Sequence, residues 1–191
     1  QRRIRRARGP ASKMIDKHRI DGSRLHLRSV RSSDVTESYV SWLNDPEVNR
    51  YLEIRFSSHT LESVRAYVED MAASSDYVFL AIVLNDGTRH VGNIKIGPIN
   101  RAHRFADVGI VIGEKKDWGK GYATEAIALA TRYAFDSLDL HRLEAGAYDC
   151  NMGSAKAFLK AGWKEECRET AKWLSDGVYV DGIRVACVRG S

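Results

Sequence analysis

Cysteine and proline are scarce in this sequence, and their scarcity excludes several classes of protein. The 191 residues include three cysteines, Cys150, Cys167 and Cys187, none of them in a C-x-x-C pair. This pattern indicates neither a disulfide scaffold nor a zinc knuckle, and it is typical of a reducing compartment. With three prolines and fifteen glycines, the chain is neither collagen-like nor disordered throughout. We therefore expect a globular protein of the cytoplasm.

Long hydrophobic runs and metal-binding spacings are missing as well. The longest apolar run, residues 77–84, is far shorter than the roughly 20 residues that a helix needs to span a bilayer. The N-terminus has no apolar stretch behind its arginines, so no secretory signal is visible. The six histidines have no spacing such as H-x-x-x-H. We therefore expect no membrane association and no metal.

Positive charge is concentrated in one short segment. The chain carries 30 Lys and Arg against 25 Asp and Glu, a net charge of +5. Residues 1–13 contain six of these bases and no acid, so residues 14–191 hold 24 bases against 25 acids. A nearly neutral domain argues against a nucleic-acid partner, which requires a basic surface. We expect 1–13 to be a basic tail, disordered or left from cloning, and 14–191 to form a single domain.

Apolar periodicity and turn residues divide residues 20–189 into strands and helices, without an internal repeat. Asn85-Asp86-Gly87 is typical of a hairpin turn, because Asn and Gly accept positive φ angles. Thr60 is the expected N-cap of one helix, and Gly162 the expected stop of another. Strands are expected at about 25–30, 77–84, 90–96, 106–112, 142–147, 163–173 and 178–188, and helices at about 35–43, 61–73, 121–138 and 153–161. This order indicates a mixed α/β (α+β) fold.

One segment, residues 110–126, passes from a buried strand through a glycine-rich loop into a helix. Unpaired amides and the helix dipole make such a helix start suitable for a phosphate or pyrophosphate. A P-loop is not present, because Lys120 is followed by Gly121 and not by Ser or Thr. A Rossmann fingerprint requires Gly or Ala where Thr124 stands. The loop therefore favours neither an NTPase nor a dehydrogenase.

A motif in this loop resembles the acyl-CoA signature of the GNAT superfamily of N-acetyltransferases. The signature is Arg/Gln-x-x-Gly-x-Gly/Ala, and here it reads Lys116-Asp-Trp-Gly119-Lys-Gly121, with lysine at the first position. Residues 151–163 and 42–47 look like the RimJ/RimL-type branch. The resemblance spans about residues 24–189. It implies a mixed, mostly antiparallel central sheet of about seven strands, with a splayed central strand pair and about four helices.

The resemblance also implies how acetyl-CoA lies on the protein. The strand that ends at Ile112 offers its amides and carbonyls to pantetheine, and Asn151 adds its side-chain amide. The glycine loop and the helix start hold the pyrophosphate, while Lys156 meets the nucleotide phosphates. The expected cofactor-binding residues are Ile110, Val111, Ile112, Lys116, Trp118, Gly119, Lys120, Gly121, Tyr122, Ala123, Thr124, Asn151 and Lys156.

Two residues are expected to be catalytic on the same resemblance. Asp107 occupies the place of an acid that accepts the amine proton, and Ser154 that of a hydroxyl near the CoA sulfur. An amide near Val111 would polarise the thioester carbonyl. Simpler alternatives stay open: Asp107 as a solvated strand residue, Ser154 and Asn151 as helix caps, and the loop glycines as turn residues.

The acceptor is less defined by the sequence. The resemblance implies that the segment 49–56 forms the acceptor wall, and the expected substrate-binding residues are Trp42, Tyr51, Glu53 and Arg55. Their mixed charges fit an anionic sugar nucleotide, so we favour a small-molecule amine such as a nucleotide-linked amino sugar. The alternatives are a peptide N-terminus, as for the RimJ/RimL namesakes, and a non-catalytic acyl-CoA-binding module. A homodimer is left open.

Overall fold

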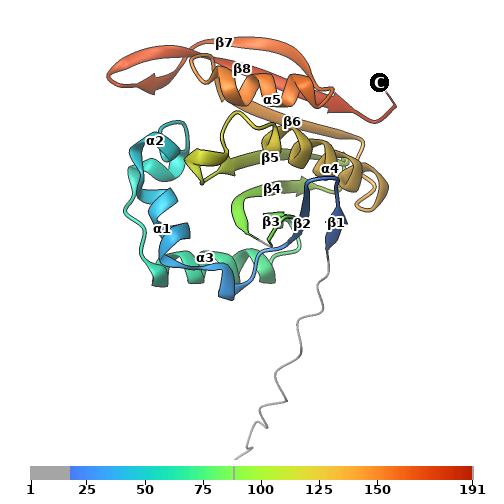
Figure 1. Cartoon of the computed structure of the whole chain (residues 1–191). Coiled ribbons are helices and arrows are strands. Elements are labelled where there is room, and N and C mark those ends of the chain that lie inside the picture. The colour runs from blue at the N-terminus through green and yellow to red at the C-terminus, as the bar shows by residue number, and fades with distance from the viewer. Residues whose placement is uncertain (1–17, 88, 191) are drawn as a thin grey trace, which may run out of the picture.

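The computed structural model describes residues 18–87 and 89–190, so the basic tail expected at 1–13 lies outside the described residues (Figure 1). The strands are β1 (Arg19–Asp21), β2 (Leu25–Ser29), β3 (Val78–Leu84), β4 (His90–Asn100), β5 (Phe105–Ile112), β6 (Arg142–Tyr148), β7 (Lys164–Ser175) and β8 (Val178–Val188). The helices are α1 (Glu37–Asn44), α2 (Pro46–Asn49), α3 (Leu61–Ala73), α4 (Tyr122–Asp136) and α5 (Met152–Lys160). Short 3-10 helices are η1 (Ser32–Asp34), η2 (Glu53–Phe56) and η3 (Lys115–Asp117).

The strands form one open sheet in the order β1-β2-β3-β4-β5-β6-β8-β7. Neighbouring strands are antiparallel except β5 and β6, which run parallel. The mixed, mostly antiparallel sheet expected from the resemblance is therefore confirmed. Among the described residues, no helix has both the length and the apolar character needed to cross a membrane.

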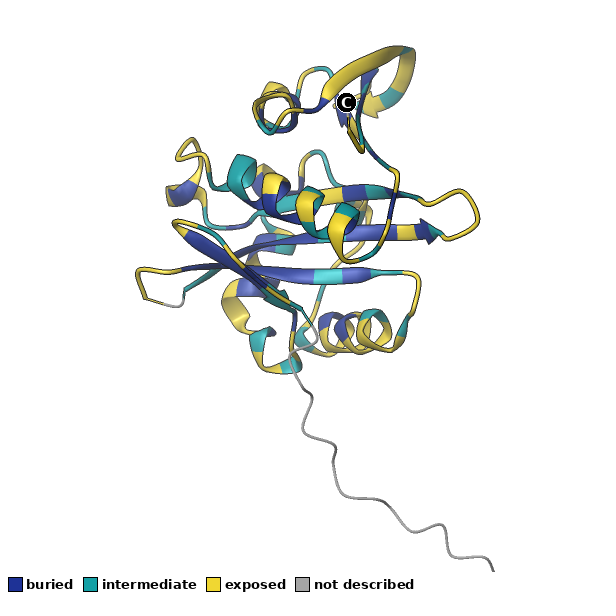
Figure 2. Cartoon of the chain, turned by 90° about the vertical axis from the view of Figure 1, so that its right-hand side faces the viewer, coloured by how far each residue is buried: buried dark blue, intermediate teal, exposed yellow. Residues whose placement is uncertain are grey.

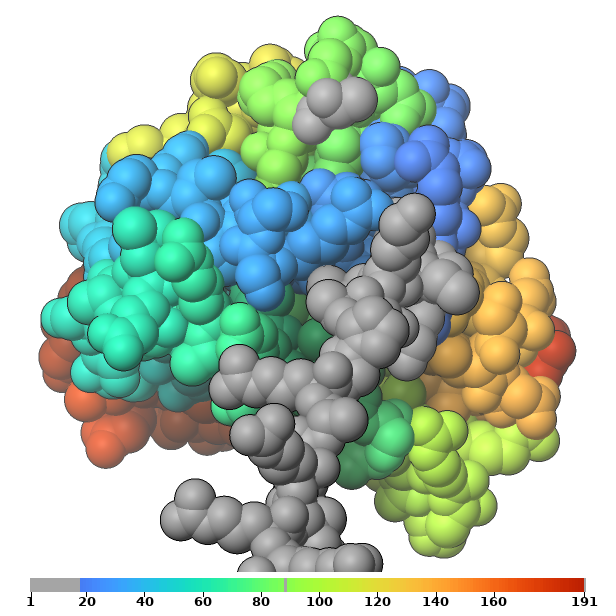
Figure 3. Space-filling view, turned by 90° about the horizontal axis from the view of Figure 1, so that it is seen from below, coloured from blue at the N-terminus to red at the C-terminus, as the bar shows by residue number. Residues whose placement is uncertain are grey.

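Helices cover both faces of the sheet, because side chains alternate between faces along each strand. On β3, Leu80 and Ile82 belong to a core shared with α4 and α5. Ala81 and Val83 belong to a second core, shared with α1 and α3. Figure 2 shows the buried residues gathered on the strands between these layers, and Figure 3 shows the underside, where α1 and α3 form the surface. The fold thus has three layers.

Two elements were not expected from the sequence, which raises the strands to eight and the α-helices to five in the described residues. β1 has three residues and only Ile20 is buried, so it shows no apolar pattern. α2 begins at Pro46, just beyond the helix predicted at about 35–43. Proline suits the first position of a new helix, where its missing N–H costs nothing. The Asp45 carboxylate caps this helix by accepting from the Glu47 amide. Thr60 caps α3 as predicted.

The two central strands separate after a short contact, as the resemblance implied. β5 and β6 pair only over Phe105–Asp107 and Arg142–Glu144. Beyond that point β5 stays with β4 as far as Ile112, while β6 continues along β8. The last residues of β5 therefore have a hydrogen-bonding edge that β6 does not cover.

Candidate functional site

A cavity of about 530 Å³ fills the opening between the separated strands. Its walls come from the end of β5, the loop before α4, the first turn of α4, the end of β6, α5 and α2. Thirteen of the predicted site residues line it: Ile110, Val111, Ile112, Trp118, Gly119, Gly121, Tyr122, Ala123, Thr124, Asn151, Ser154, Lys156 and Tyr51. Segments that lie up to about one hundred residues apart in sequence thus meet around one space.

The edge of β5 offers backbone groups to this cavity. The Gly113 amide donates to the Val91 carbonyl at 2.9 Å. Bonded and non-bonded pairs alternate in an antiparallel ladder, so Val111 pairs with Asn93, and Ile110 and Ile112 direct their backbone groups away from β4. The Ile112 carbonyl accepts from the Trp118 indole nitrogen at 2.7 Å. The amides of Ile110 and Ile112, and the Ile110 carbonyl, are therefore the groups that face the opening.

The loop before α4 has the conformation that an anion site requires. Gly119 and Gly121 have φ angles of 75° and 81°, a region that suits glycine. Gly121 is the N-cap of α4, and its carbonyl accepts the first intrahelical bond, from Glu125 at 3.1 Å. The amides of Tyr122 to Thr124 precede that bond and have no partner within the helix. This end of the cavity can therefore bind a pyrophosphate through backbone amides.

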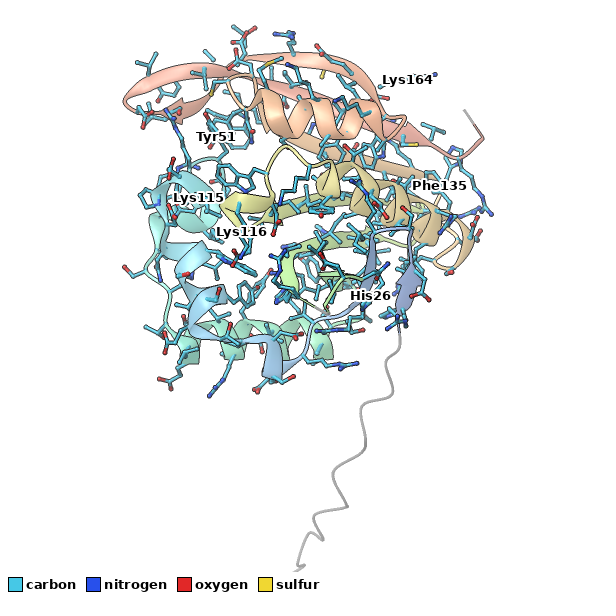
Figure 4. All side chains as sticks on the ribbon, viewed as in Figure 1. His26, Tyr51, Lys115, Lys116, Phe135 and Lys164 are labelled. Atoms are coloured by element: carbon cyan, nitrogen blue, oxygen red, sulfur yellow. The ribbon has the colours of Figure 1, made fainter. Side chains whose placement is uncertain are left out.

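The two lysines of the motif lie beside the loop and outside the cavity lining. The Lys116 ammonium is 3.3 Å from Glu114. The Lys120 ammonium is 2.9 Å from Asp117, whose side chain is 1% exposed. Arg89 also donates to Asp117, at 2.6 Å, and this hydrogen bond holds the pKa of the Asp117 carboxyl below its usual range. Figure 4 labels Lys116 next to Lys115 at the end of β5. Their roles toward a cofactor stay predictions.

The start of α5 places two predicted residues at the cavity. Asn151 is the N-cap of α5, and its side-chain oxygen accepts from the Ser154 amide at 3.3 Å. The capping alternative for Asn151 is therefore present in the structure, and it leaves the amide NH₂ group for a ligand. Ser154 is half-buried and lines the cavity, as does the exposed Lys156.

Asp107 stands at the point where β5 and β6 separate, outside the cavity lining. It is the last residue of β5 that pairs with β6. Its side chain is 46% exposed, and the Arg184 guanidinium lies 3.6 Å from its carboxylate. Burial and the neighbouring Glu144 carboxylate raise the pKa of Asp107, while Arg184 opposes the shift. Asp107 and Ile110 are three positions apart along the extended strand, a distance of about 10 Å.

Three of the predicted substrate residues are joined by a residue that the sequence did not reveal, Tyr148, which lies outside the cavity lining, as do Glu53 and Arg55. Its hydroxyl accepts from Arg55 at 2.8 Å and donates to Glu53 at 3.2 Å. Its ring stacks on Trp173, with centroids 5.1 Å apart, and lies 5.5 Å from Tyr51. Tyr148 thus brings three of the four predicted substrate residues together. The only signal in the sequence was its position at the end of a strand.

Trp42, the fourth predicted substrate residue, lies elsewhere. Its side chain is buried in the core under α1, against His90 at 5.2 Å between ring centroids. A Cβ added to Gly113 would meet the indole at 2.0 Å, so glycine is required there. The indole nitrogen donates to Glu114 at 3.2 Å. Trp42 therefore supports the end of β5 from behind the cavity.

The tip of the β7–β8 hairpin reaches across to the acceptor wall. Asp176, in the turn, forms an ion pair with Arg50 at 2.5 Å. Arg55 donates to the Leu174 carbonyl at 3.3 Å. Figure 4 shows Tyr51 between this hairpin and α2. No group of metal-ligating side chains occurs among residues 18–87 and 89–190.

Comparisons with known proteins agree with this geometry. Residues 24–164 match a family model described as an acetyltransferase (GNAT) domain. Over 173 residues the chain is 30% identical to a probable N-acetyltransferase, YjcK, of Bacillus subtilis, which covers 85% of this chain and 92% of that protein.

Two solved structures share the fold at lower identity. One is Mycobacterium smegmatis RimJ in complex with CoA-disulfide, with a TM-score of 0.78, 22% identity, and coverage of 90% of this chain and 88% of that chain. The other is spermidine N-acetyltransferase from Vibrio cholerae in complex with CoA and spermine, with a TM-score of 0.78, 20% identity, and coverage of 88% and 97%.

Proposed function

This chain belongs to the GNAT family of acetyltransferases, and on that premise we propose that it transfers the acetyl group of acetyl-CoA to the primary amine of a small molecule. The amine attacks the thioester directly, in a ternary complex. The observation that carries the proposal is the single cavity, whose lining extends from the glycine loop at α4 to Tyr51 beside α2. Donor and acceptor have room in one space, on either side of the separated strands.

The donor end fits acetyl-CoA through its backbone groups. The amides at the start of α4 suit the pyrophosphate, because they are unpaired and carry the positive end of the helix dipole. The free backbone groups of Ile110 and Ile112 suit the two amides of the pantetheine arm. The Asn151 side chain can donate to the same arm from the facing wall.

The transfer requires three functions from the protein. An amide of Ile110 or Ile112 stabilises the negative charge that develops on the thioester oxygen. The amine nitrogen forms a bond to the carbonyl carbon, and the carbon–sulfur bond breaks with its electron pair on sulfur. Ser154 gives a proton to the departing thiolate and regains one through water as Asp107 releases the amine proton, so that no net hydroxide forms. Asp107 accepts the amine proton through water, because about 10 Å of strand separates it from Ile110.

The charges at the acceptor end favour an acceptor with one amine and an anionic group. The carboxylates of this region already have partners: Glu53 accepts from Tyr148, and Asp107 lies beside Arg184. A polyamine such as spermine would have to displace these partners. Arg50 lies over the Tyr51 ring and Arg55 over the Tyr148 ring. An anionic acceptor would replace their exposed carboxylate partners, Asp176 and Glu53. A nucleotide-linked amino sugar carries the required combination of charges.

The proposal is tested with purified protein, acetyl-CoA and an acceptor panel, with thiol release and mass spectrometry of the acceptor as readouts. The panel contains amino-sugar nucleotides, polyamines and peptides with free N-termini. We expect acetylated amino-sugar nucleotide at the highest kcat/KM. Preferential acetylation of peptides or polyamines would overturn the acceptor class. Binding of acetyl-CoA without acetylation of any amine would favour a non-catalytic module.

A further inference from the structure

Arg24 makes an unusual set of contacts with the glycine loop. It lies in the turn before β2, nearly one hundred residues from the loop in sequence. Its guanidinium donates to the Lys120 carbonyl at 2.7 Å and to the Gly121 carbonyl at 3.3 Å. Its Nε atom donates to Glu125 at 2.8 Å. A single side chain thus binds two consecutive carbonyls of the loop and a carboxylate of α4.

These contacts hold the direction of the Lys120–Gly121 peptide group and reinforce that of the Gly121–Tyr122 group, whose carbonyl also accepts from the Glu125 amide at 3.1 Å. In a trans peptide, the carbonyl and the following amide point to opposite sides. Arg24 holds the Lys120 and Gly121 carbonyls and does not itself line the cavity. The amides of the same two peptide groups belong to Gly121 and Tyr122, which do line it. Holding the carbonyls on the outer side therefore keeps these two amides directed toward the cavity.

Arg24 also balances a negative charge beside the anion site. Glu125 lies in the first turn of α4, and its side chain is only 14% exposed. Its carboxylate accepts from the Arg24 backbone amide at 2.9 Å and from the Ser23 hydroxyl at 3.1 Å. Without the guanidinium, this carboxylate would repel a pyrophosphate at the same helix end. With it, the pair is neutral as a whole.

The turn that carries Arg24 is packed closely on α4. A Cβ added to Gly22 would meet Leu129 at 2.7 Å and Glu125 at 2.9 Å. Arg24 also lies over the Tyr122 ring, with 5.1 Å to its centroid. The backbone that carries Arg24 is therefore held in place by this packing. The planar guanidinium donates to two carbonyls at once, which the single ammonium of a lysine could not do in the same geometry.

We infer that Arg24 is a positioning residue for the donor site: it orients the amides of Gly121 and Tyr122 toward the pyrophosphate and neutralises Glu125 beside them. The inference rests on the proposed use of acetyl-CoA. It adds a residue outside the signature motif to the machinery that holds the donor.

The test compares ligands with and without a pyrophosphate. For Arg24→Gln we expect the Kd of CoA, measured by calorimetry, to rise about tenfold, since charge-assisted hydrogen bonds are lost. The KM for acetyl-CoA should rise in parallel, with little change in kcat. Kinetics with S-acetylpantetheine, which lacks the pyrophosphate, should not change. Arg24→Lys should fall between wild type and Arg24→Gln.

A second substitution separates positioning from folding. Glu125→Gln in the Arg24→Gln background should recover part of the CoA affinity, because the uncompensated carboxylate is removed. Arg19→Gln serves as the matched control, since Arg19 is exposed and pairs only locally with Asp21. Its Kd should equal that of wild type.

The outcomes distinguish this inference from the proposed function. An unchanged CoA affinity in Arg24→Gln, or an equal loss with CoA and with S-acetylpantetheine, overturns the role of Arg24. Wild-type protein that binds CoA but acetylates no amine overturns the proposed function. In that case the difference in Kd between wild type and Arg24→Gln would still support the positioning role.

Discussion

The donor end and the acceptor end of the cavity are held together in different ways. The proposed donor end is mainly backbone, from the edge of β5, the loop with Gly119 and Gly121, and the first turn of α4, with the Asn151 and Lys156 side chains on the facing wall. The segments from β5 to α4 are continuous in sequence and rest on the main core. The proposed acceptor end is lined by Glu47, Val48, Tyr51 and Leu52. Outside the lining, side chains of η2, β6 and the β7–β8 hairpin hold this segment through contacts such as Arg50–Asp176. The comparison teaches that the donor geometry is set by the fold, while the acceptor geometry is set by a few exchangeable contacts.

The largest expected effect is at the donor end. Gly121→Glu places a side chain at a φ angle of 81° and a carboxylate next to the pyrophosphate site. We expect at least about a hundredfold loss of CoA affinity, or about 2.7 kcal/mol, and no rise in melting temperature on adding CoA. Gly177→Glu is a matched control, because Gly177 also has φ 81° and open space around its Cβ position. A CoA-dependent rise in the melting temperature of Gly121→Glu would contradict the assignment of this loop.

The next effect concerns the proton path between the two ends. Asp107 must be ionised to accept a proton, and its pKa is raised by burial and by Glu144, so the acidic limit of wild-type activity lies at higher pH than an ordinary carboxyl predicts. Asp107→Asn should reduce kcat/KM about tenfold at pH values above the pKa of Asp107, where the wild-type carboxylate is ionised and few amines are neutral, and less as pH rises further. A pH profile of kcat/KM measures this. A pH-independent defect would remove Asp107 from the mechanism.

The raised pKa of Asp107 also predicts how Asp107→Asn changes the stability of the protein. A carboxyl whose pKa is raised by folding is destabilising when ionised, at every pH above its ordinary range. Asp107→Asn should therefore melt no lower than wild type at neutral pH. A marked drop in melting temperature would instead indicate that the contact with Arg184 at 3.6 Å is structural.

A smaller effect is expected at the acceptor wall. Tyr148→Phe removes the hydroxyl that joins Arg55 to Glu53 and keeps the ring that stacks on Trp173. We expect the KM of the acceptor to rise about fivefold, as for one hydrogen bond, and the KM of acetyl-CoA to stay constant. Steady-state kinetics with each substrate varied in turn measures both. Tyr179→Phe, at an exposed tyrosine of β8, is the control. An equal effect on both substrates would mean that the two ends are not independent.

The smallest effect should come from the hairpin tip. Asp176→Asn breaks the ion pair with Arg50, in which both side chains are more than half exposed. Exposed pairs contribute little, so the acceptor KM should change by less than about twofold and the melting temperature should not change measurably. A large change in acceptor KM would show that the tip contacts the acceptor itself.

The donor end could be predicted from the sequence because its residues are neighbours in the chain. The strand before Ile112, the loop glycines and the helix after Gly121 form one pattern, and the structure places them together. Gly121 is the N-cap at the predicted helix start. The cap at Thr60 was predictable for the same reason, since cap chemistry is local. The hairpin at Asn85 also forms where it was predicted, but neither Asn85 nor Gly87 has a positive φ angle, so the turn chemistry expected there was wrong.

The remaining residues of the site depend on tertiary contacts that no local pattern encodes. Tyr148 meets Glu53 across 95 positions, and Arg24 meets Glu125 across 101. Trp42 was assigned to substrate from its place in a motif, but packing decides its position, because Gly113 leaves room for the indole behind β5. β1 and α2 were not predicted for another reason, because three and four residues are too few to show a hydrophobic periodicity.

The short pairing of β5 with β6 divides the single sheet into two blocks of strands. Three residue pairs join the block β1–β5 to the block β6–β8–β7, whereas most other junctions of the sheet are longer. Few backbone hydrogen bonds therefore hold the two blocks together at this junction. A ligand that forms hydrogen bonds with the free edge of β5 and with Asn151 would link the two blocks where β5 and β6 are not hydrogen-bonded to each other. We therefore expect amide exchange along β5 and β6 to slow together when CoA binds, as if a strand had been added to the sheet.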